Sequence, residues 1–233
     1  EARRQKNIRR SFIVLKDISA PQMLATDLYQ SCYRPIIDLW AAASKSIADE
    51  YARTLSQMTT DAPADVQREI DSAEQAFQRL FFTLTPSLRS FALKVERAIR
   101  TRWVRQVYSA TSVDLSTRLG PSDVTETLET IIARNAALVK DVSAQIQGRI
   151  SDAVYRGLNA RAPAREVAKE INDAVALGRK RSLRIAADQL SKASSVLAEE
   201  RQRQAGIDQV IWASSGKLHA RPRYASACLR PSE

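Results

Sequence analysis

Residues 86–105 have the sequence PSLRSFALKVERAIRTRWVR, and this stretch decides the class of fold. Its apolar side chains recur at intervals of three and four residues, which is the spacing that gathers them on one face of an α-helix. That apolar stripe consists of Leu88, Phe91, Ala92, Val95, Ile99 and Trp103. We therefore predict an amphipathic helix from Pro86 to about Ala110.

The region around this helix lacks glycine. All 6 glycines of the chain lie at or after Gly120, so the first 119 residues contain none of the residue on which tight β-hairpins rely. We expect the whole first half to be helical. The short apolar run Phe12-Ile13-Val14-Leu15 is compatible with either a brief strand or the lead-in to a helix.

Two further helices are predicted before Pro86. One begins at Pro21 and runs to Leu55, with Pro35 expected to kink or restart it. The second follows a loop and N-cap at residues 60–63, buries a stripe from Val66 to Phe81, and ends at Thr85-Pro86.

Gly120-Pro121-Ser122 marks the clearest internal boundary, with Ser122 expected to cap the next helix. We predict helices through residues 128–138 and 146–158, and a short one from Pro163 to near Gly178. A long helix should then run from Arg179 to a C-cap at Gly206, with Leu183 in its apolar stripe. A helix-turn-helix pair formed by the helices at 163–174 and from 179 is a further interpretation.

The pattern changes period after Gly206, because Ile207, Val210, Ile211 and Trp212 favour a strand. The predicted fold class is thus mainly α, an extended bundle of long amphipathic helices with a small α+β element at the C-terminal end. The corresponding domains are a helical N-terminal region at 1–119, a helical region at 120–206 and the start of a mixed β element at 207–233, which we expect to be truncated.

The chain is basic, with 36 Lys and Arg against 26 Asp and Glu, a net charge of +10 and a pI near 9.9. This balance favours DNA, RNA or an acidic protein as a partner. No apolar run approaches the roughly 20 residues of a membrane helix, so no membrane partner is expected. Candidate phosphate contacts lie at the chain start, on the outer face of the helix from Pro86, and at the start of the predicted helix from Arg179. They are Arg3, Arg4, Arg9, Arg10, Arg89, Arg97, Arg100, Arg105, Arg179, Lys180 and Arg181.

A solvated face is the alternative interpretation of the basic stripe at 89–105, in which arginine stems cover apolar surface and Arg102 projects into the edge of the stripe. The cluster at Arg179 opposes the helix dipole if it begins a helix, which would hint at an external anion.

Motifs of common enzymes are absent from the sequence. It contains no phosphate-binding G-x-x-x-x-G-K-[ST], no G-x-G-x-x-G and no H-E-x-x-H. His219 is the single histidine, and Cys32 and Cys228 lie far apart in the chain, so clustered zinc ligands are not expected. Cys228 follows His219 by nine residues, a spacing that fits no Cys–His nucleophile pair. Cys32, at helical spacing, is expected in the core. We nominate no catalytic residue, no metal ligand and no cofactor.

The second half carries a recognisable order of motifs. Arg134-Asn135-Ala136-Ala137-Leu138 comes first, and a stretch at 186–189 follows the helix that Pro163 opens. Gly206, Trp212 and the Ser215-Gly216 turn then lead to Arg221-Pro222. The motif positions are Asp188, Gln189, Gly206, Trp212, Ser215, Gly216, Arg221 and Pro222.

This order resembles the phage Mu F-like minor head protein family, also called phage head morphogenesis proteins, over roughly residues 133–225. Two positions depart from that family: Lys217 stands where an aspartate is common, and Tyr224 where a histidine is common. The resemblance implies a virion protein inside the capsid near the portal vertex, present in several copies and made in the host cytoplasm. It also implies the portal protein as partner, with packaged double-stranded DNA and the major capsid or scaffold protein as further ones.

Two other functions stay open at this point. The chain could be a nucleic-acid-binding assembly factor that the virion does not retain, or the delivery module of an enzymatic or toxin domain beyond Glu233. Trp212 is expected to pack in the core of the motif region. Arg221 is expected either to pair with an acid such as Asp208 or to reach a partner.

Overall fold

The computed structural model describes residues 13–14, 18–57, 62–117, 119–205 and 228–229. Within these ranges the chain is mainly α, as the sequence predicts. The order of elements is β1 (Ile13–Val14), α2 (Met23–Leu28), a π-helical turn η1 (Tyr29–Tyr33), α3 (Arg34–Gln57), α4 (Ala62–Thr111), a 3-10 turn η2 (Pro121–Val124), α5 (Thr125–Ala160), α6 (Ala164–Gln204) and β2 (Cys228–Leu229).

The chain divides into two compact units, each assembled from separate stretches of sequence. Unit 1 comprises residues 1–21, 92–130 and 190–233, and unit 2 comprises residues 22–91 and 131–189. Helices α4, α5 and α6 each contribute residues to both units. The domains predicted at 1–119, 120–206 and 207–233 follow the sequence, whereas these units interleave along it.

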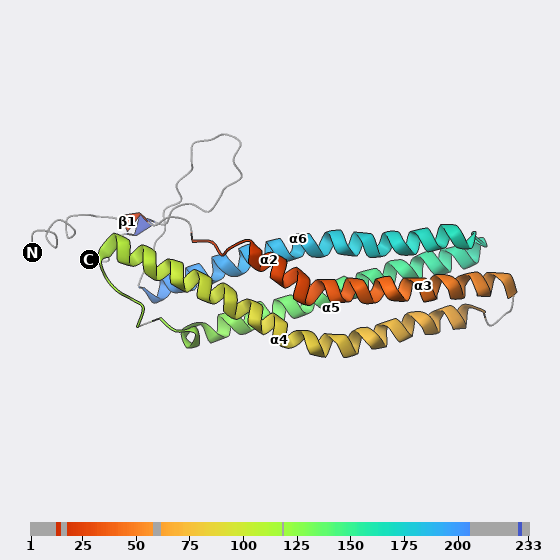
Figure 1. Cartoon of the computed structure of the whole chain (residues 1–233), viewed down its shortest axis with the longest axis horizontal. Coiled ribbons are helices and arrows are strands. Elements are labelled where there is room, and N and C mark those ends of the chain that lie inside the picture. Colours follow the sequence, from red (N-terminus) through yellow and green to blue (C-terminus); the bar gives the residue numbers. More distant parts are fainter. Residues whose placement is uncertain (1–12, 15–17, 58–61, 118, 206–227, 230–233) are drawn as a thin grey trace, which may run out of the picture. The chain divides into compact units, whose positions relative to one another are not determined.

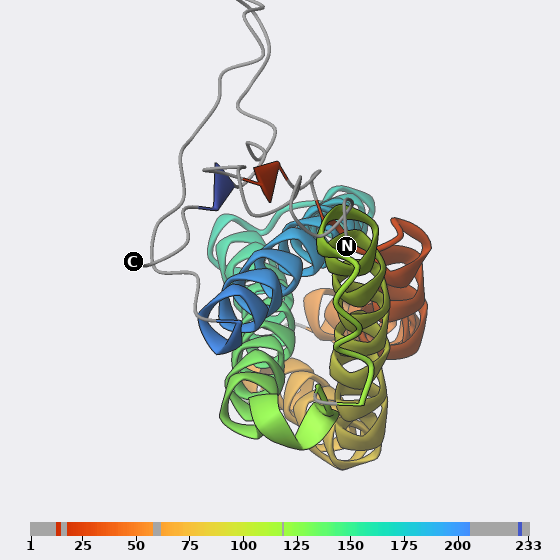
Figure 2. The same ribbon diagram turned by 90° about the vertical axis from the view of Figure 1, so that its left-hand side faces the viewer.

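Unit 2 is a bundle built from α2–α3 and from the unit 2 parts of α4, α5 and α6 (Figures 1 and 2). One tryptophan and one tyrosine of α3 form hydrogen bonds to neighbouring segments. Trp40 Nε1 donates to Ser143 Oγ of α5 at 2.8 Å, and Tyr51 Oη donates to the backbone oxygen of Ala162 at 2.8 Å. Since Trp40, Ser143 and Tyr51 are all fully buried, these bonds satisfy polar groups that water cannot reach.

Pro35 explains the π-helical turn between α2 and α3. A proline has no N–H to donate to the carbonyl four residues earlier, and its ring crowds that carbonyl. The backbone widens just before it, so that the Arg34 N–H donates to the oxygen of Tyr29, five residues back. The predicted restart of the helix at Pro35 is confirmed in this form.

Unit 1 contains residues 92–111 of α4, the η2 turn, the start of α5 and the last turns of α6. Trp103 and Val107 of α4 form a buried cluster against Ile18, Ala110 and Leu115. The extended segment before α2 joins the same unit, because the Ala20 N–H donates to Ser194 Oγ of α6 at 3.3 Å and Arg102 donates to the oxygen of Ser19. Arg102 therefore lies at the edge of the apolar stripe, as predicted.

Three predicted helix breaks are wrong. Thr85-Pro86 lies inside α4, the helices predicted at 128–138 and 146–158 are one helix, α5, and α6 continues through Gly178. The break at Pro86 is bridged by packing on both sides, since Leu84, Leu88 and Phe91 are all buried. A proline inside a helix costs about 3 kcal/mol, which the burial of a few large apolar side chains offsets.

Gly178 has a packing role and is not the end of a helix. A Cβ built on it would lie 2.6 Å from Ile146 Cδ1 of α5, so only glycine lets the two helices approach this closely. The helix-turn-helix interpretation of residues 163–179 is consequently wrong, because there is no turn. Arg179, Lys180 and Arg181 lie in the middle of α6 and not at its N-terminus.

Helices α4 and α5 are followed by residues other than glycine in the left-handed region. Ser112 follows α4 with a φ of 63°, and Arg161 follows α5 with a φ of 50°. After α5 the Ala162 N–H donates to the oxygen of Gly157 at 2.8 Å, which closes the last turn before Pro163. Pro163 does precede a helix, as predicted. At η2 the Gly120 N–H donates to the Asp123 carboxylate at 2.6 Å. The Ser122 hydroxyl also donates to that carboxylate and accepts no helix N–H within the described residues, so the predicted Ser122 cap is wrong.

The structure also tests two smaller predictions, one on the run at 12–15 and one on Leu183. The run at 12–15 contains a strand, β1, which pairs antiparallel with β2 through Ile13 with Leu229 and Val14 with Cys228. Leu183, placed in the apolar stripe of its helix, is 49% exposed because its side of α6 faces away from the core. Gly206 and the strand predicted at 207–212 lie outside the described residues, and α6 ends two residues earlier at Gln204.

Candidate functional site: two basic surfaces

The predicted DNA-contacting residues fall into three groups in the structure. Arg3, Arg4, Arg9 and Arg10 lie outside the described residues, as do the motif positions from Gly206 to Pro222. Arg89, Arg97, Arg100 and Arg105 lie on α4, and Arg179, Lys180 and Arg181 lie on α6. The structure gives the second and third groups different surroundings.

The exposed face of α4 in unit 1 carries two free cations. Arg97 and Arg105 are exposed and form no ion pair or hydrogen bond within the described parts of the chain. Tyr108 and Leu93 are also exposed on this stretch, by 57% and 43%. We refer to Leu93, Arg97, Arg105 and Tyr108 as the basic face of α4. Arg89, also exposed, belongs to unit 2.

Arg100 does not belong to that free face. Its Nε lies 3.0 Å from Glu96 Oε1, and its Nη1 donates to the backbone oxygen of Leu119 at 3.3 Å. Glu96, which the sequence places among solvated cations, is only 2% exposed. A buried carboxylate is stable only when cations and donors surround it, and so Arg100 serves the interior of unit 1.

The main partner of Glu96 is Arg201 of α6, a residue that sequence reasoning missed. Arg201 is fully buried, and its Nη2 donates to Glu96 Oε1 and to the oxygen of Gly120, both at 2.7 Å. Its Nη1 donates to Gln204 Oε1 at 2.7 Å and lies 3.7 Å from Asp123 Oδ2. The only sequence signal was Glu96 itself, the lone acid between Glu74 and Asp114.

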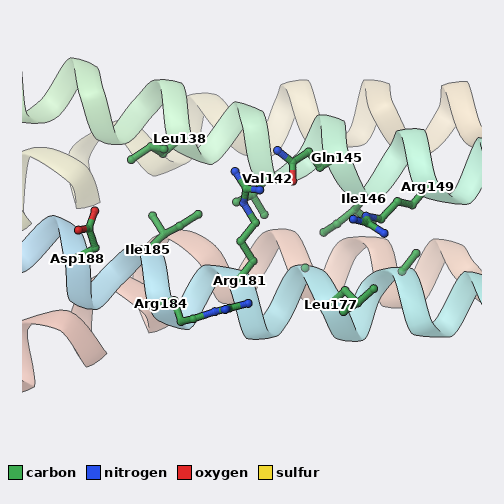
Figure 3. Close-up of a pocket in the computed structure, with 12 residues that line it drawn as sticks. Leu138, Val142, Gln145, Ile146, Arg149, Leu177, Arg181, Arg184, Ile185 and Asp188 are labelled. Carbon is green, nitrogen blue, oxygen red and sulfur yellow. The ribbon is translucent and has the colours of Figure 1, made fainter.

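A groove between α5 and α6 forms the second surface, and it lies wholly in unit 2 (Figure 3). Its volume is about 510 Å³. Apolar side chains from both helices line it, including Leu138, Val142 and Ile146 of α5 and Leu177 and Ile185 of α6. Arg149 of α5 and Arg181 and Arg184 of α6 supply its positive charge.

The three groove arginines differ in how they are held. Arg181 is half-buried and its Nη2 donates to Asp141 Oδ2 of α5 at 2.8 Å, while Asp141 also accepts from Gln145 Nε2. Arg149 and Arg184 are exposed and have no ion pair or hydrogen bond among the residues that the structure describes. Of the predicted cluster, only Arg181 lines this groove, whereas Arg179 and Lys180 are exposed elsewhere on α6.

A second cavity of about 500 Å³ adjoins the groove and shares Arg149, Ala174 and Leu177 with it. Its other lining residues include Asp152, Asp173 and the ion pair of Arg156 with Glu170, whose Nη2 and Oε2 lie 2.9 Å apart. Asp188 lines the opposite end of the groove. Carboxylates therefore lie on both sides of the groove arginines.

Cys32 is fully buried in unit 2, and burial raises the pKa of its thiol, although a hydrogen bond with Ser31 acts in the other direction. A neutral, inaccessible thiol is a poor nucleophile, which agrees with the predicted core position. Within the described ranges no cluster of His, Cys, Asp and Glu could hold a metal ion. Nor does any helix in those ranges have the length and apolar character needed to cross a membrane.

Comparison with known proteins finds a relative of this chain by sequence. The chain is 29% identical to an uncharacterized protein of Haemophilus influenzae (strain Rd) over 116 residues. The matched region is 49% of this chain and 26% of that protein, so the chain spans only part of its relative. No family model matches the chain, and no solved structure matches it.

Proposed function

We propose that this chain is a structural, non-enzymatic protein of a tailed-phage head, docked inside the capsid at the portal vertex and involved in head morphogenesis and in packaging or ejection of DNA. The resemblance to Mu F-like minor head proteins over roughly residues 133–225 supports this proposal. The proposal includes several copies around the portal and a small mixed β element within residues 207–233. We assign no function to Lys217 or Tyr224 in this proposal.

The observation that carries the DNA-facing part of the proposal is the basic face of α4. Arg97 and Arg105 are exposed and unpaired within the described chain, although many surface arginines of this protein do form ion pairs. Unpaired guanidinium groups can bind phosphate without first losing a partner. Tyr108, at 57% exposure, adds an aromatic surface with a hydroxyl donor. This arrangement suits non-specific contact with the sugar–phosphate backbone.

The same face supports the second candidate, a nucleic-acid-binding assembly factor that finished particles lack. Quantitative mass spectrometry of nuclease-treated, gradient-purified particles distinguishes the two functions. We expect a low, fixed ratio of this protein to the portal protein. Absence of the protein from finished particles would contradict portal docking and leave the assembly factor.

The basic face of α4 is tested directly by replacing Arg97 and Arg105 with glutamine. We expect weaker binding to a fluorescein-labelled duplex, and a plot of log affinity against log salt whose slope is lower by about 2, because roughly one counterion is released per phosphate contact. Arg100 stays unchanged in this variant, since it contacts buried Glu96.

The control variant replaces Arg134 and Arg165 with glutamine. Both are exposed, unpaired among the described residues, and part of unit 2, so the variant makes the same change of net charge away from the basic face of α4. An equal loss of DNA affinity in the two variants would mean that net charge alone drives binding, and the proposed face would be wrong.

A further inference from the structure

The groove between α5 and α6 has an apolar floor that is only partly covered. Val142 and Ile146 are buried at its base, whereas Leu177 at its edge is 48% exposed. The close approach of the helices at Gly178 brings Ile146 against α6, and Leu177 precedes this contact by one residue. Covering the exposed half of a leucine stabilises a complex by roughly 1 kcal/mol, so the floor favours an apolar partner.

Three arginines line the groove together with these apolar side chains. Figure 3 shows Arg149 extending from α5 and Arg181 from α6 toward the space between the two helices, with Arg184 lying along α6. Arg181 is fixed by Asp141 at 2.8 Å, while Arg149 and Arg184 have no acceptor among the described residues. Two unpaired cations beside an apolar surface suit a ligand that carries carboxylates next to apolar side chains.

The distribution of charge argues against a long polyanion. Asp188 lines one end of the groove, and Asp152 and Asp173 line the cavity that continues from the other end. DNA laid along α5 and α6 would meet these carboxylates on both sides of the arginines, and its phosphates would gain nothing from Leu177. A segment with a short acidic patch avoids both problems.

The dimensions suit a helix. Along α5 the two cavities extend from Leu138 to Arg156, a length of about 27 Å at the helical rise, which a partner helix of about 18 residues would match. An amphipathic helix laid in a groove between two helices is a recurring mode of protein recognition.

We propose that the groove between α5 and α6 is a docking site for an acidic amphipathic helix of a partner protein. Apolar side chains of that helix pack on Leu177, Ile146 and Val142. Its central carboxylates bind Arg149 and Arg184, while Arg181 stays with Asp141. The proposal does not depend on the phage assignment, because it uses only the chemistry of the groove.

The probe is a fluorescein-labelled synthetic peptide of about 18 residues, with leucines at helical spacing on one face and glutamates confined to its central turns. Fluorescence anisotropy with the full chain should show saturable binding. A scrambled peptide of the same composition should bind at least about tenfold more weakly. No saturable binding of the amphipathic peptide, or equal binding of the two, would overturn the proposal.

Two pairs of variants locate the binding. The groove variant Arg149→Glu/Arg184→Glu should lose peptide affinity by at least about tenfold, whereas Arg134→Glu/Arg165→Glu, with the same change of charge on exposed residues outside the groove, should stay within about twofold. Leu177→Asp should weaken binding more than Leu183→Asp, because the two leucines are almost equally exposed and only Leu177 lines the groove.

Circular dichroism of each variant establishes that it is folded, and all four substituted arginines are exposed. An equal loss in the two charge variants would mean that binding follows net charge and would overturn the proposal. A duplex DNA probe serves as the competing ligand. If DNA binds more tightly than the peptide and the groove variant abolishes that binding, the groove is a nucleic-acid site and the proposed occupant is wrong.

Discussion

Unit 1 and unit 2 bury polar groups in different ways. In unit 1 the buried polar side chains include a carboxylate and a guanidinium, Glu96 and Arg201, which α4 and α6 bring together. Among the described residues of unit 2 the buried polar groups are neutral: Trp40 donates to Ser143, and Ser182 and Asn135 donate to the carbonyls four residues before them. A buried charge must find its partners or unfold the structure, whereas a neutral serine can satisfy itself on its own helix.

The two units also differ in the contacts that join their helices. Within unit 2, Gly157 and Gly178 of neighbouring helices each lie against a side chain that leaves no space for a Cβ. In unit 1 the Arg201 side chain instead bridges α6 to Glu96 and to the backbone at Gly120. Unit 1 thus joins its helices through a buried ion pair, and unit 2 joins its helices through close contacts at glycines.

Breaking the charge pairing should have the largest effect. We expect Arg201→Ala to lower the free energy of unfolding by about 3 to 5 kcal/mol, because it leaves Glu96 buried with its main partner removed. Urea denaturation followed by circular dichroism measures the change. Arg203→Ala removes an exposed guanidinium from the same helix and should leave the unfolding midpoint nearly unchanged.

The double variant Glu96→Leu/Arg201→Met sharpens this test. If the cost comes from an unpaired buried charge, replacing both partners by apolar side chains should restore most of the lost stability. A double variant that is no more stable than Arg201→Ala would show that the bonds of Arg201 to Gly120 and Gln204 matter more than its pairing with Glu96.

Breaking the fit of unit 2 should have a smaller effect. A Cβ on Gly157 would lie 2.5 Å from Val167 Cγ2 and 2.8 Å from Tyr51 Oη, the hydroxyl that donates to Ala162. We expect Gly157→Ala to destabilise the protein by roughly 1 to 3 kcal/mol through overpacking. Gly148→Ala, in the same helix with nothing within 4 Å of the added Cβ, should stabilise it by roughly 0.5 to 1 kcal/mol.

Opposite signs for these two glycines, measured by thermal or urea unfolding, would confirm that unit 2 selects glycine for space at position 157. If both substitutions stabilise the protein, the contact between α5 and its neighbours is looser than the structure shows.

The smallest expected effect concerns pH. Burial raises the pKa of Cys32 above its ordinary value of 9.0, and burial together with the nearby Cys32 thiol raises that of Tyr33 above 10.0. Groups whose pKa is higher in the folded state stabilise it fully at low pH and lose that contribution as pH rises through the ordinary pKa toward the folded one. Stability should therefore decline above about pH 9.

Urea unfolding from pH 7 to 10.5 in a Cys228→Ser background measures this decline, with Cys32→Ala as the comparison. The substitution should reduce the loss of stability that begins near the ordinary thiol pKa of 9.0. Identical pH profiles with and without Cys32 would show that its thiol does not contribute.

Much of the fold follows from sequence pattern. The stripe from Leu88 to Trp103 is buried as the helical spacing predicts, and Cys32 lies in the core. The helix boundaries do not follow in the same way, because Pro86 and Gly178 predict breaks that the structure does not have. Proline and glycine weaken an isolated helix, but burial of the residues on either side outweighs that local cost.

The candidate sites were only partly predictable. Arg97 and Arg105 are exposed, as their helical positions indicate, while Arg100 on the same helix turns to a buried acid. Of the groove arginines, the sequence singled out only Arg181, and it missed Arg149 and Arg184. An available signal was the stretch 174–187, which contains Arg179, Lys180, Arg181 and Arg184 but no acid.

The sequence by itself determined that this protein is helical and basic, and which face of each helix is apolar. Periodicity and charge are properties of residues close together in the sequence, so they do not depend on what each helix packs against. Only the tertiary structure decided that Glu96 meets Arg201, that Gly178 admits Ile146, and that Arg149 and Arg184 line one groove. These pairs lie on different helices, and a helical pattern tells which side faces inward without telling what lies across from it.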